Sequence, residues 1–270
     1  MAHGFRAQFD DYLQALYSHA LQQARDFVEF VAPEPGWIVI EVGCGSGRIA
    51  FDGRLAERLG PSGQLLLTDP SVSQLNACAR RVEAAPAPWV RVMRAAAEQL
   101  PVASETADVV MAVSVLQFTD QARALAEMCR VTKVGGSLAL STALDYPWPP
   151  AWQEVLAPVR AALAEHGLEY RPFLPTNHDL RSRVERAGLR IDRSHVVDEE
   201  CLEFPDADLA IGLWQQSGLV PLLLRDLPTD RHEGVQEAFD EQLRAMFART
   251  SAQERRITMT ILELIARRTA

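Results

Sequence analysis

The chain has 270 residues, of which 48% are hydrophobic and 23% are charged, and its formal net charge is −9. This length suits one large α/β domain or two small ones, and the composition is that of an ordinary globular protein. A net negative charge repels nucleic acid unless one face is strongly basic, and the basic residues occur only in short runs such as Arg80-Arg81. We therefore expect no nucleic-acid partner.

Cysteine spacing and the N-terminus exclude further classes. The four cysteines form no C-x-x-C pair: Cys44, Cys78, Cys129 and Cys201. This spacing supports neither a zinc site nor a disulfide framework, so we expect no metal and reduced thiols. Charged residues occur at positions 6, 10 and 11, and no run reaches the roughly 18 apolar residues of a membrane span. We expect a cytoplasmic protein without a membrane partner.

The first half of the chain alternates strands and helices. Residues 5–32 have apolar side chains at helical spacing, and Pro33, Pro35 and Gly36 end this helix. Residues 37–42 are short, β-branched and followed by glycines, which predicts a buried strand. Further strands are predicted at 64–68, 89–93, 107–113 and 137–142, with helices at 49–59, 73–83 and 122–129.

The pattern changes after Thr142. A helix ending near Gly167 and a second helix over residues 179–187 precede predicted strands at 189–197 and 257–265. Because strands that alternate with helices need crossover connections, we predict an α/β fold with a parallel sheet. We assign residues 1–270 to a single domain with an N-terminal helical cover (1–35), a core (36–197 and 257–270) and a helical insertion acting as a lid (198–256).

A glycine-rich loop follows the first predicted strand. The segment from Glu41 to Gly47 reads EVGCGSG and joins a strand to a helix, where open α/β sheets bind ligands. Its spacing is G-x-G-x-G, whereas dinucleotide-binding loops have G-x-G-x-x-G, and Arg48 stands where the last glycine would be. No lysine follows as in a phosphate-binding loop. We expect a ligand without a pyrophosphate, with a purely structural turn as the alternative.

Asp69 ends the second predicted strand, 22 residues after Gly47. A carboxylate at this position can accept hydrogen bonds from ribose hydroxyls. The alternative is a turn or helix-capping aspartate, because Asp69-Pro70-Ser71 is also a good turn sequence.

With these residues the sequence resembles the class I S-adenosylmethionine-dependent methyltransferases, especially the small-molecule group that includes the ubiquinone and menaquinone C-methyltransferases. The resemblance covers about residues 37–142. The matching segments are 38–47 (first motif), 67–71 (ribose turn), 97–101 (adenine side), 107–110 (fourth strand) and 131–136 (turn before the fifth strand). It implies a Rossmann-like, doubly wound, seven-stranded sheet, mostly parallel with an antiparallel last strand.

The resemblance also implies a cofactor site for S-adenosylmethionine. Glu41 would lie near the methionine amino end and Asp69 would hold the ribose. The other implied cofactor-binding residues are Gly43, Cys44, Gly45, Gly47, Pro70, Ala97, Glu98 and Ser114. Two residues depart from the family pattern: Ala96 replaces an aspartate that accepts from the adenine amino group, and Val134 replaces a proline. Either Glu98 or a backbone carbonyl takes over from the aspartate, or adenine is held by apolar contact.

The expected chemistry is in-line attack on the sulfonium methyl group, which depends mainly on alignment. A catalytic base is needed only when the acceptor must lose a proton. The candidates, each with a surface or capping role as the alternative, are His166, His178, His195 and His232, with His178 the best of a weak set. Tyr146, Trp148 and Trp214 could line an apolar acceptor pocket, and ordinary packing is the alternative.

The sequence therefore predicts methyl transfer to a small, partly apolar molecule. The alternative is a non-methylating member of the fold, such as a cyclase or a cofactor-binding regulatory protein. A nucleic-acid methyltransferase is disfavoured by the acidic charge and because Ser114-Val115-Leu116-Gln117 stands where an Asn-Pro-Pro-Tyr motif would be. A homodimer interface over residues 219–224 is an alternative to the lid.

Overall fold

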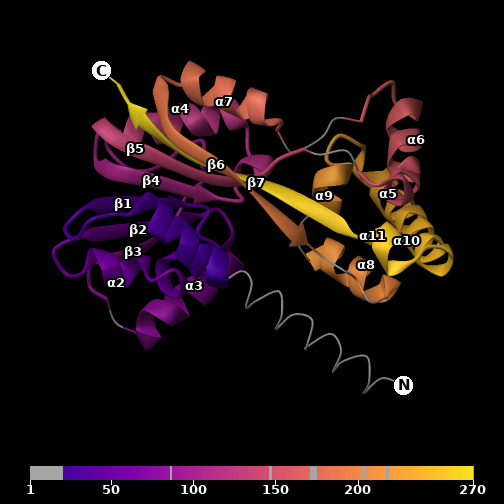
Figure 1. The fold of residues 1–270 in the computed structure, drawn as a ribbon, viewed down its shortest axis with the longest axis horizontal. Coiled ribbons are helices and arrows are strands. Elements are labelled where there is room, and N and C mark those ends of the chain that lie inside the picture. The colour runs from indigo at the N-terminus through magenta and orange to yellow at the C-terminus, as the bar shows by residue number, and fades with distance from the viewer. Residues whose placement is uncertain are drawn as a thin grey trace. The chain divides into compact units, whose positions relative to one another are not determined.

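A computed structural model describes residues 21–85, 87–145, 148–170, 175–201, 204, 206–216 and 219–269. The chain forms two compact units (Figure 1). Unit 1 comprises Met1–Ala143, Asn177–Val197 and Ile261–Ala270, and unit 2 comprises Leu144–Thr176 and Asp198–Thr260. Residues 1–20, which belong to the predicted N-terminal cover, lie outside the described residues.

One sheet contains the seven strands of the described chain, in the order β3-β2-β1-β4-β5-β7-β6. Their bounds are β1 Ile38–Val42, β2 Gln64–Asp69, β3 Val90–Arg94, β4 Ala107–Val113, β5 Thr132–Ala143, β6 Leu189–Cys201 and β7 Ile257–Arg268. β1 pairs in parallel with β2 and with β4, while β7 pairs antiparallel with β5. The predicted Rossmann-like sheet, mostly parallel with an antiparallel last strand, is confirmed.

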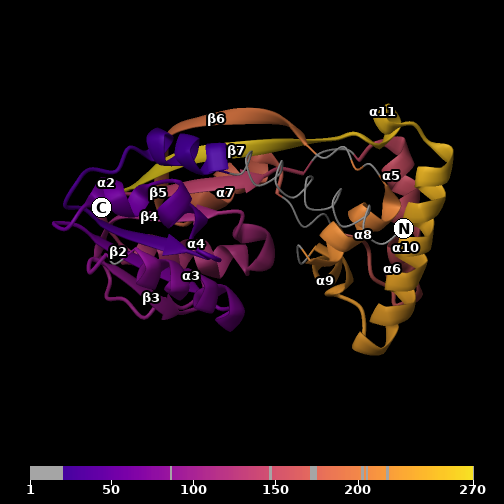
Figure 2. The same ribbon diagram turned by 90° about the horizontal axis from the view of Figure 1, so that it is seen from below.

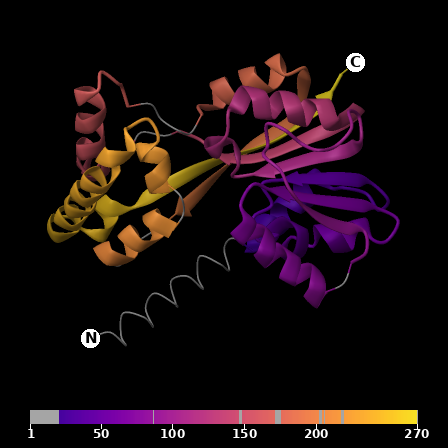
Figure 3. The same ribbon diagram turned by 180° about the vertical axis from the view of Figure 1, so that it is seen from behind.

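Helices cover both faces of this sheet (Figures 1 and 2). On one face, the helix at residues 21–31, the turn Arg48–Asp52, α2 (Leu55–Leu59) and α3 (Val72–Ala84) share one apolar cluster with alternate strand residues such as Val39, Leu65 and Met111. α4 (Gln121–Val131) packs on β4 and β5, and α7 (Asn177–Arg186) packs on α4. Neither helix contributes to the first cluster, so they form the second layer (Figure 3).

The helix predicted at 49–59 is interrupted. Its first part, Arg48–Asp52, is a π-helical turn, and Arg54 has a left-handed φ of 62° before α2 begins. Gly53 lies at the break, where an added β-carbon would be 2.6 Å from the Ile49 carbonyl oxygen and 2.9 Å from that of Ala24. Close packing against the helix at 21–31 therefore interrupts the helix, which helical periodicity alone does not reveal.

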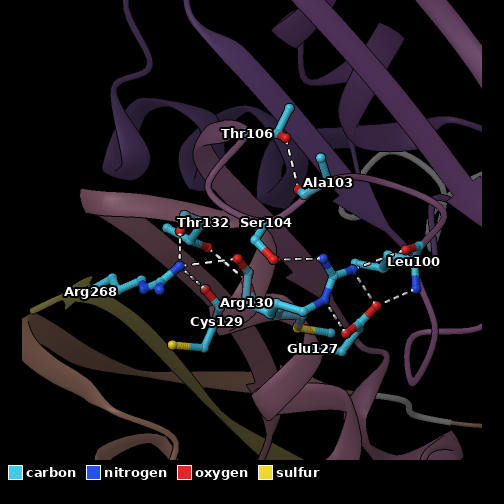
Figure 4. A network of polar contacts seen from close by, with 10 residues as sticks. Leu100, Ala103, Ser104, Thr106, Glu127, Cys129, Arg130, Thr132 and Arg268 are labelled. Carbon is cyan, nitrogen blue, oxygen red and sulfur yellow. Dashed lines mark hydrogen bonds and ion pairs between the residues drawn. The ribbon is translucent and has the colours of Figure 1, made fainter. Parts of the chain in front are cut away.

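A polar network fixes the connection between β3 and β4, which contains no helix (Figure 4). Arg130 of α4 donates to Glu127, to the Leu100 carbonyl and to the Ser104 hydroxyl, and Glu127 accepts the Leu100 N–H at 2.7 Å. At the same C-terminal end of α4, Arg268 donates to the carbonyl oxygens of Cys129, Arg130 and Thr132. The Cys129 carbonyl also accepts the Thr132 N–H and the Arg130 carbonyl also accepts the Glu105 N–H, so Arg268 adds a positive charge beside acceptors at the negative end of the helix.

Unit 2 is helical around an aromatic core. Its helices are α5 Pro150–Val155, α6 Ala157–Glu165, α8 Ala207–Gln216, α9 Leu219–Leu224, α10 His232–Arg249 and α11 Ala252–Arg255. The long helix α10 contacts α5, α6 and α8. Residues 144–176 therefore pack with the insertion, whereas the predicted boundaries placed them in the core. The segments share unit 2 because α5 and α6 bury their apolar faces on α10.

Within the described part of the chain, no helix is long and apolar enough to cross a membrane.

Candidate active site

The glycine loop lies where the strand order reverses. β1 has β2 on one side and β4 on the other, so the chain connections leave β1 and β4 in opposite directions. Open α/β sheets bind ligands at the carboxyl ends of the strands at such a point. Gly43, Gly45 and Gly47 follow β1 with φ angles of 68°, 53° and 84°. All three angles are left-handed, which side chains other than glycine rarely adopt.

The three glycines differ in their surroundings. A β-carbon on Gly43 would lie 2.4 Å from Val115 Cγ2, and one on Gly47 would lie 2.8 Å from the Phe51 ring. Next to Gly45 the nearest atom would be Gln74 Oε1, at an ordinary 3.7 Å. Gly43 and Gly47 are thus required by packing and by backbone conformation. At Gly45 the left-handed backbone favours glycine, but packing against other protein atoms does not require it.

Asp69, at the end of β2, holds the loop. Its Oδ2 accepts the Gly45 N–H at 2.9 Å and its Oδ1 accepts the Ser71 N–H at 2.8 Å. The side chain is buried, and Ser71 rather than Asp69 caps α3. Each carboxylate oxygen keeps a second lone pair, so Asp69 can hold the loop and still accept a ligand hydroxyl. Pro70 is exposed beside it, and its carbonyl accepts from Arg94.

Glu41 is a buried carboxyl group at the end of β1, with 3% of its surface exposed. Burial raises the pKa of this carboxyl well above its usual value, and the nearby Cys78 and Asp69 raise that pKa further. Its Oε2 has no hydrogen-bond partner among the described residues. A buried oxygen without a donor is unfavourable, and a ligand cation would relieve it.

Cys44 is buried within the loop, and its N–H donates to the Thr68 carbonyl at 2.9 Å. A hydrogen bond with Cys78 of α3, together with burial, raises the pKa of the Cys44 thiol. Cys44 is therefore a neutral packing group, and only its backbone can contribute to a ligand cradle.

The predicted adenine-side turn lies beside the end of β2, because the Ala95 N–H donates to the Asp69 carbonyl at 3.2 Å. Ala97 is buried and Ala96 is exposed. The Glu98 carboxylate accepts the backbone N–H of Asp120, which caps α4. One Glu98 oxygen is therefore engaged at the start of α4, and the three alternatives for the missing aspartate, namely Glu98, a backbone carbonyl or apolar contact, stay predictions.

The segment after β4 bends sharply. Ser114 is exposed with a left-handed φ of 54°, and its N–H donates to the Ser141 carbonyl at 2.8 Å. This bend carries Val115 against Gly43 and leads into a single 3₁₀ turn, Leu116–Phe118. Gln117 in that turn is buried, which the sequence analysis did not foresee. The available signal was a polar residue between two apolar ones, Leu116 and Phe118, four positions after a buried strand.

The four candidate histidines lie on different elements, two in each unit. His166 contacts the Ala162 carbonyl through Nδ1, and His232 contacts the Leu227 carbonyl through Nε2. His195 lies on β6, with Nε2 3.2 Å from Glu263 and its ring against Phe30. His178 is exposed on α7, in an open hollow with Asp179, Ser182, Glu185 and Arg186.

Two of the three predicted pocket residues lie in unit 2. Trp148 and Trp214 have ring centroids 5.6 Å apart, and Trp214 also stacks on Trp152 at 5.8 Å. Trp214 and Trp152 are buried, while Trp148 is partly exposed. Tyr146 lies outside the described residues. Trp214 is therefore a core residue of unit 2.

No three described His, Cys, Asp or Glu side chains lie close enough together to hold a metal ion.

Residues 40–140 match the family model described as "Methyltransferase domain". Over 108 residues the chain is 38% identical to the ubiquinone/menaquinone biosynthesis C-methyltransferase UbiE of Bordetella parapertussis, covering 40% of this chain and 41% of that protein. The chain spans 34% to 41% of the length of the curated relatives it matches. The resemblance to class I S-adenosylmethionine-dependent methyltransferases is thus confirmed for this segment.

Solved structures agree on the fold. A protein of Bacillus halodurans C-125 assigned as a methyltransferase is 16% identical, with 92% of this chain and 100% of that chain covered and a TM-score of 0.62. The [4+2]-cyclase SpnF is 19% identical, with 93% and 82% covered and a TM-score of 0.59. At these identities the likeness concerns the fold, which both a methyltransferase and a cyclase share.

Proposed function

We propose that the protein transfers the methyl group of S-adenosylmethionine to a small, partly apolar molecule, and the match of residues 40–140 to the methyltransferase domain model supports this proposal. One observation carries the proposal: the left-handed glycine loop is hydrogen-bonded to Asp69 on one side and has the buried, incompletely paired Glu41 on the other. This arrangement offers a carboxylate to ribose hydroxyls, open backbone to the methionine portion and an anion to its ammonium group.

The residues present fit the cofactor. Glu41 Oε2 lacks a donor among the described residues, which an ammonium group would supply, and no side chain lies closer than 3.7 Å to a β-carbon added at Gly45. Asp69 keeps lone pairs for the ribose while it fixes Gly45. The turn at Ala97 and Glu98 lies beside Asp69 and meets the adenine, with its backbone taking the place of the aspartate that the family carries at Ala96.

The cofactor supplies an electrophilic methyl group on a sulfonium, and the protein supplies alignment and exclusion of water. The loop and Asp69 fix the position of the sulfur through backbone and ribose contacts. Phe118, 52% exposed in the turn after β4, offers an apolar surface at the same edge of the sheet. An acceptor with an apolar part would pack on it, and an acceptor that attacks as a neutral amine needs no base.

Calorimetry tests this proposal without knowledge of the acceptor. S-adenosylhomocysteine should bind the purified protein at one site, with NAD as the control, because the G-x-G-x-G loop lacks the pyrophosphate-binding pattern. Binding of NAD but not of S-adenosylhomocysteine would refute the cofactor assignment. A protein that binds S-adenosylhomocysteine but never forms it from S-adenosylmethionine would instead belong to the non-methylating members of the fold.

A further inference from the structure

Unpaired oxygen atoms gather around the end of β1 and the segment after β4. In unit 1, the buried side-chain polar atoms without a partner among the described residues are Glu41 Oε2, Gln117 Oε1, Gln121 Oε1 and Arg183 Nε. Three of these four are acceptor oxygens. Native proteins rarely bury an acceptor without a donor, so such an atom is satisfied either by water or by a ligand, and its position decides between the two.

The contact between Gly43 and Val115 brings the segment that carries Gln117 next to the glycine loop. A β-carbon on Gly43 would lie 2.4 Å from Val115 Cγ2, so the bend after β4 lies directly against the glycine loop. Glu41 precedes Gly43 by two residues and Gln117 follows Val115 by two residues. The two unpaired acceptors thus belong to chain segments that meet at this contact, and Gln117 is 91% buried there, with 9% of its surface exposed.

The two acceptors differ in charge, and a ligand group that satisfies both must carry more than one donor hydrogen. Glu41 offers a carboxylate oxygen and Gln117 a neutral amide oxygen, and neither has a donor. A hydroxyl group has one donor hydrogen and can satisfy only one of them, whereas an ammonium group has three donors and a positive charge. Charge-assisted hydrogen bonds of this type are also the stronger ones.

We propose that the side-chain oxygen of Gln117 accepts a hydrogen bond from the α-ammonium group of the cofactor's methionine portion, beside Glu41. The inference rests on the proposed function and deepens it by assigning a residue of this chain to cofactor recognition. Gln117 is a binding residue in this assignment, and it makes the site select cofactors that carry the amino-acid portion.

The affinities for two ligands distinguish the contribution of this contact from that of the rest of the site. S-adenosylhomocysteine carries the ammonium group, whereas 5′-methylthioadenosine has the same adenosine and sulfur but no amino-acid portion. Gln117→Leu should weaken S-adenosylhomocysteine about 10- to 100-fold, in the range of a hydrogen bond to a charged group, and leave 5′-methylthioadenosine unchanged. Gln117→Glu keeps an acceptor and should retain S-adenosylhomocysteine binding. Gln121→Leu, which removes the other unpaired amide oxygen, is the matched control and should change neither affinity.

The ligand-free protein gives a second readout. Because Gln117 Oε1 has no partner among the residues that the structure describes, Gln117→Leu should melt at the wild-type temperature or above it. A lower melting temperature would mean that the oxygen is bonded internally, which overturns the proposal. So would wild-type affinity of Gln117→Leu for S-adenosylhomocysteine, or an equal loss for both ligands, while the proposed function would stand. If the wild type binds neither ligand, the proposed function itself fails and this proposal with it.

Discussion

Asp69 Oδ2 accepts the Gly45 backbone N–H at 2.9 Å, which joins the end of β2 to the middle of the glycine loop. The same carboxylate is assigned to the ribose, so its removal affects both contacts. Asp69→Ala should lose about 1 to 3 kcal/mol of S-adenosylhomocysteine binding, measured by calorimetry. Asp69→Asn keeps one acceptor oxygen for Gly45 and should lose less. Unchanged affinity in a folded Asp69→Ala protein would remove the ribose assignment.

A substitution at Gly45 tests whether glycine is needed there for ligand binding or for folding. Gly45→Val should abolish cofactor binding and leave the circular dichroism spectrum nearly intact, because no atom of the protein lies closer than 3.7 Å to the added β-carbon. Gly135 has a similar left-handed φ of 81° with nothing within 4 Å, so Gly135→Val is the matched control for backbone strain. Binding that survives in Gly45→Val would mean that the loop is only a structural turn.

Glu41 predicts a pH dependence. Burial raises the pKa of its carboxyl in the folded protein above the ordinary value of 4.5, so the folded state holds this proton more tightly than the unfolded state. Stability from this group is therefore greatest below 4.5 and declines as the pH rises toward the folded pKa. Denaturant unfolding of the ligand-free protein at several pH values should show this decline, and Glu41→Gln should remove it. An identical pH profile in both proteins would contradict the shift.

Binding of the ligand should lower the raised pKa of the Glu41 carboxyl. An ammonium group beside Glu41 favours the ionised carboxylate, so binding of S-adenosylhomocysteine below the raised pKa of Glu41 releases a proton. Calorimetry in two buffers of different ionisation enthalpy measures that proton. Glu41→Gln should bind without this component of proton release, and equal release by both proteins would place the ammonium group elsewhere.

Arg268 stabilises unit 1 through the C-terminus of α4. Its guanidinium donates to three carbonyl oxygens, those of Cys129, Arg130 and Thr132. Arg268→Ala leaves these acceptors without the cation and should lower the free energy of unfolding by about 1 to 3 kcal/mol. The control is Arg267→Ala, which removes a half-exposed ion pair with Asp192 and should cost less than about 1 kcal/mol. Equal losses in denaturant unfolding would contradict this ranking.

Residues 198–256 stay a predicted cover for the acceptor. If they close over ligands, their amides should exchange quickly in the free protein and slow down when cofactor and acceptor bind together. The alternative, a fixed dimer interface at α9, predicts equal protection in both states and a mass in light scattering that depends on these residues.

Local rules were sufficient for most of the core. Short apolar runs ended by glycine or by turn residues identified β1, β2 and β4, and the glycine spacing with Asp69 predicted the cofactor edge. Features that depend on packing between distant segments were missed. The break at Gly53 comes from the helix at 21–31, and Glu98 is held by the start of α4. The burial of Gln117 follows from the bend at Ser114, which sequence periodicity does not encode.

The central claim is methyl transfer, and one measurement addresses it directly. The protein is incubated with S-adenosylmethionine labelled in the methyl group and with a small-molecule cell extract, and label and S-adenosylhomocysteine are followed by mass spectrometry. We predict that both S-adenosylhomocysteine and a labelled small, partly apolar product accumulate with the wild type, and that neither does with Gly45→Val. Cofactor that binds but stays unconverted, with no labelled product, would contradict the account and place the protein among the non-methylating members of the fold.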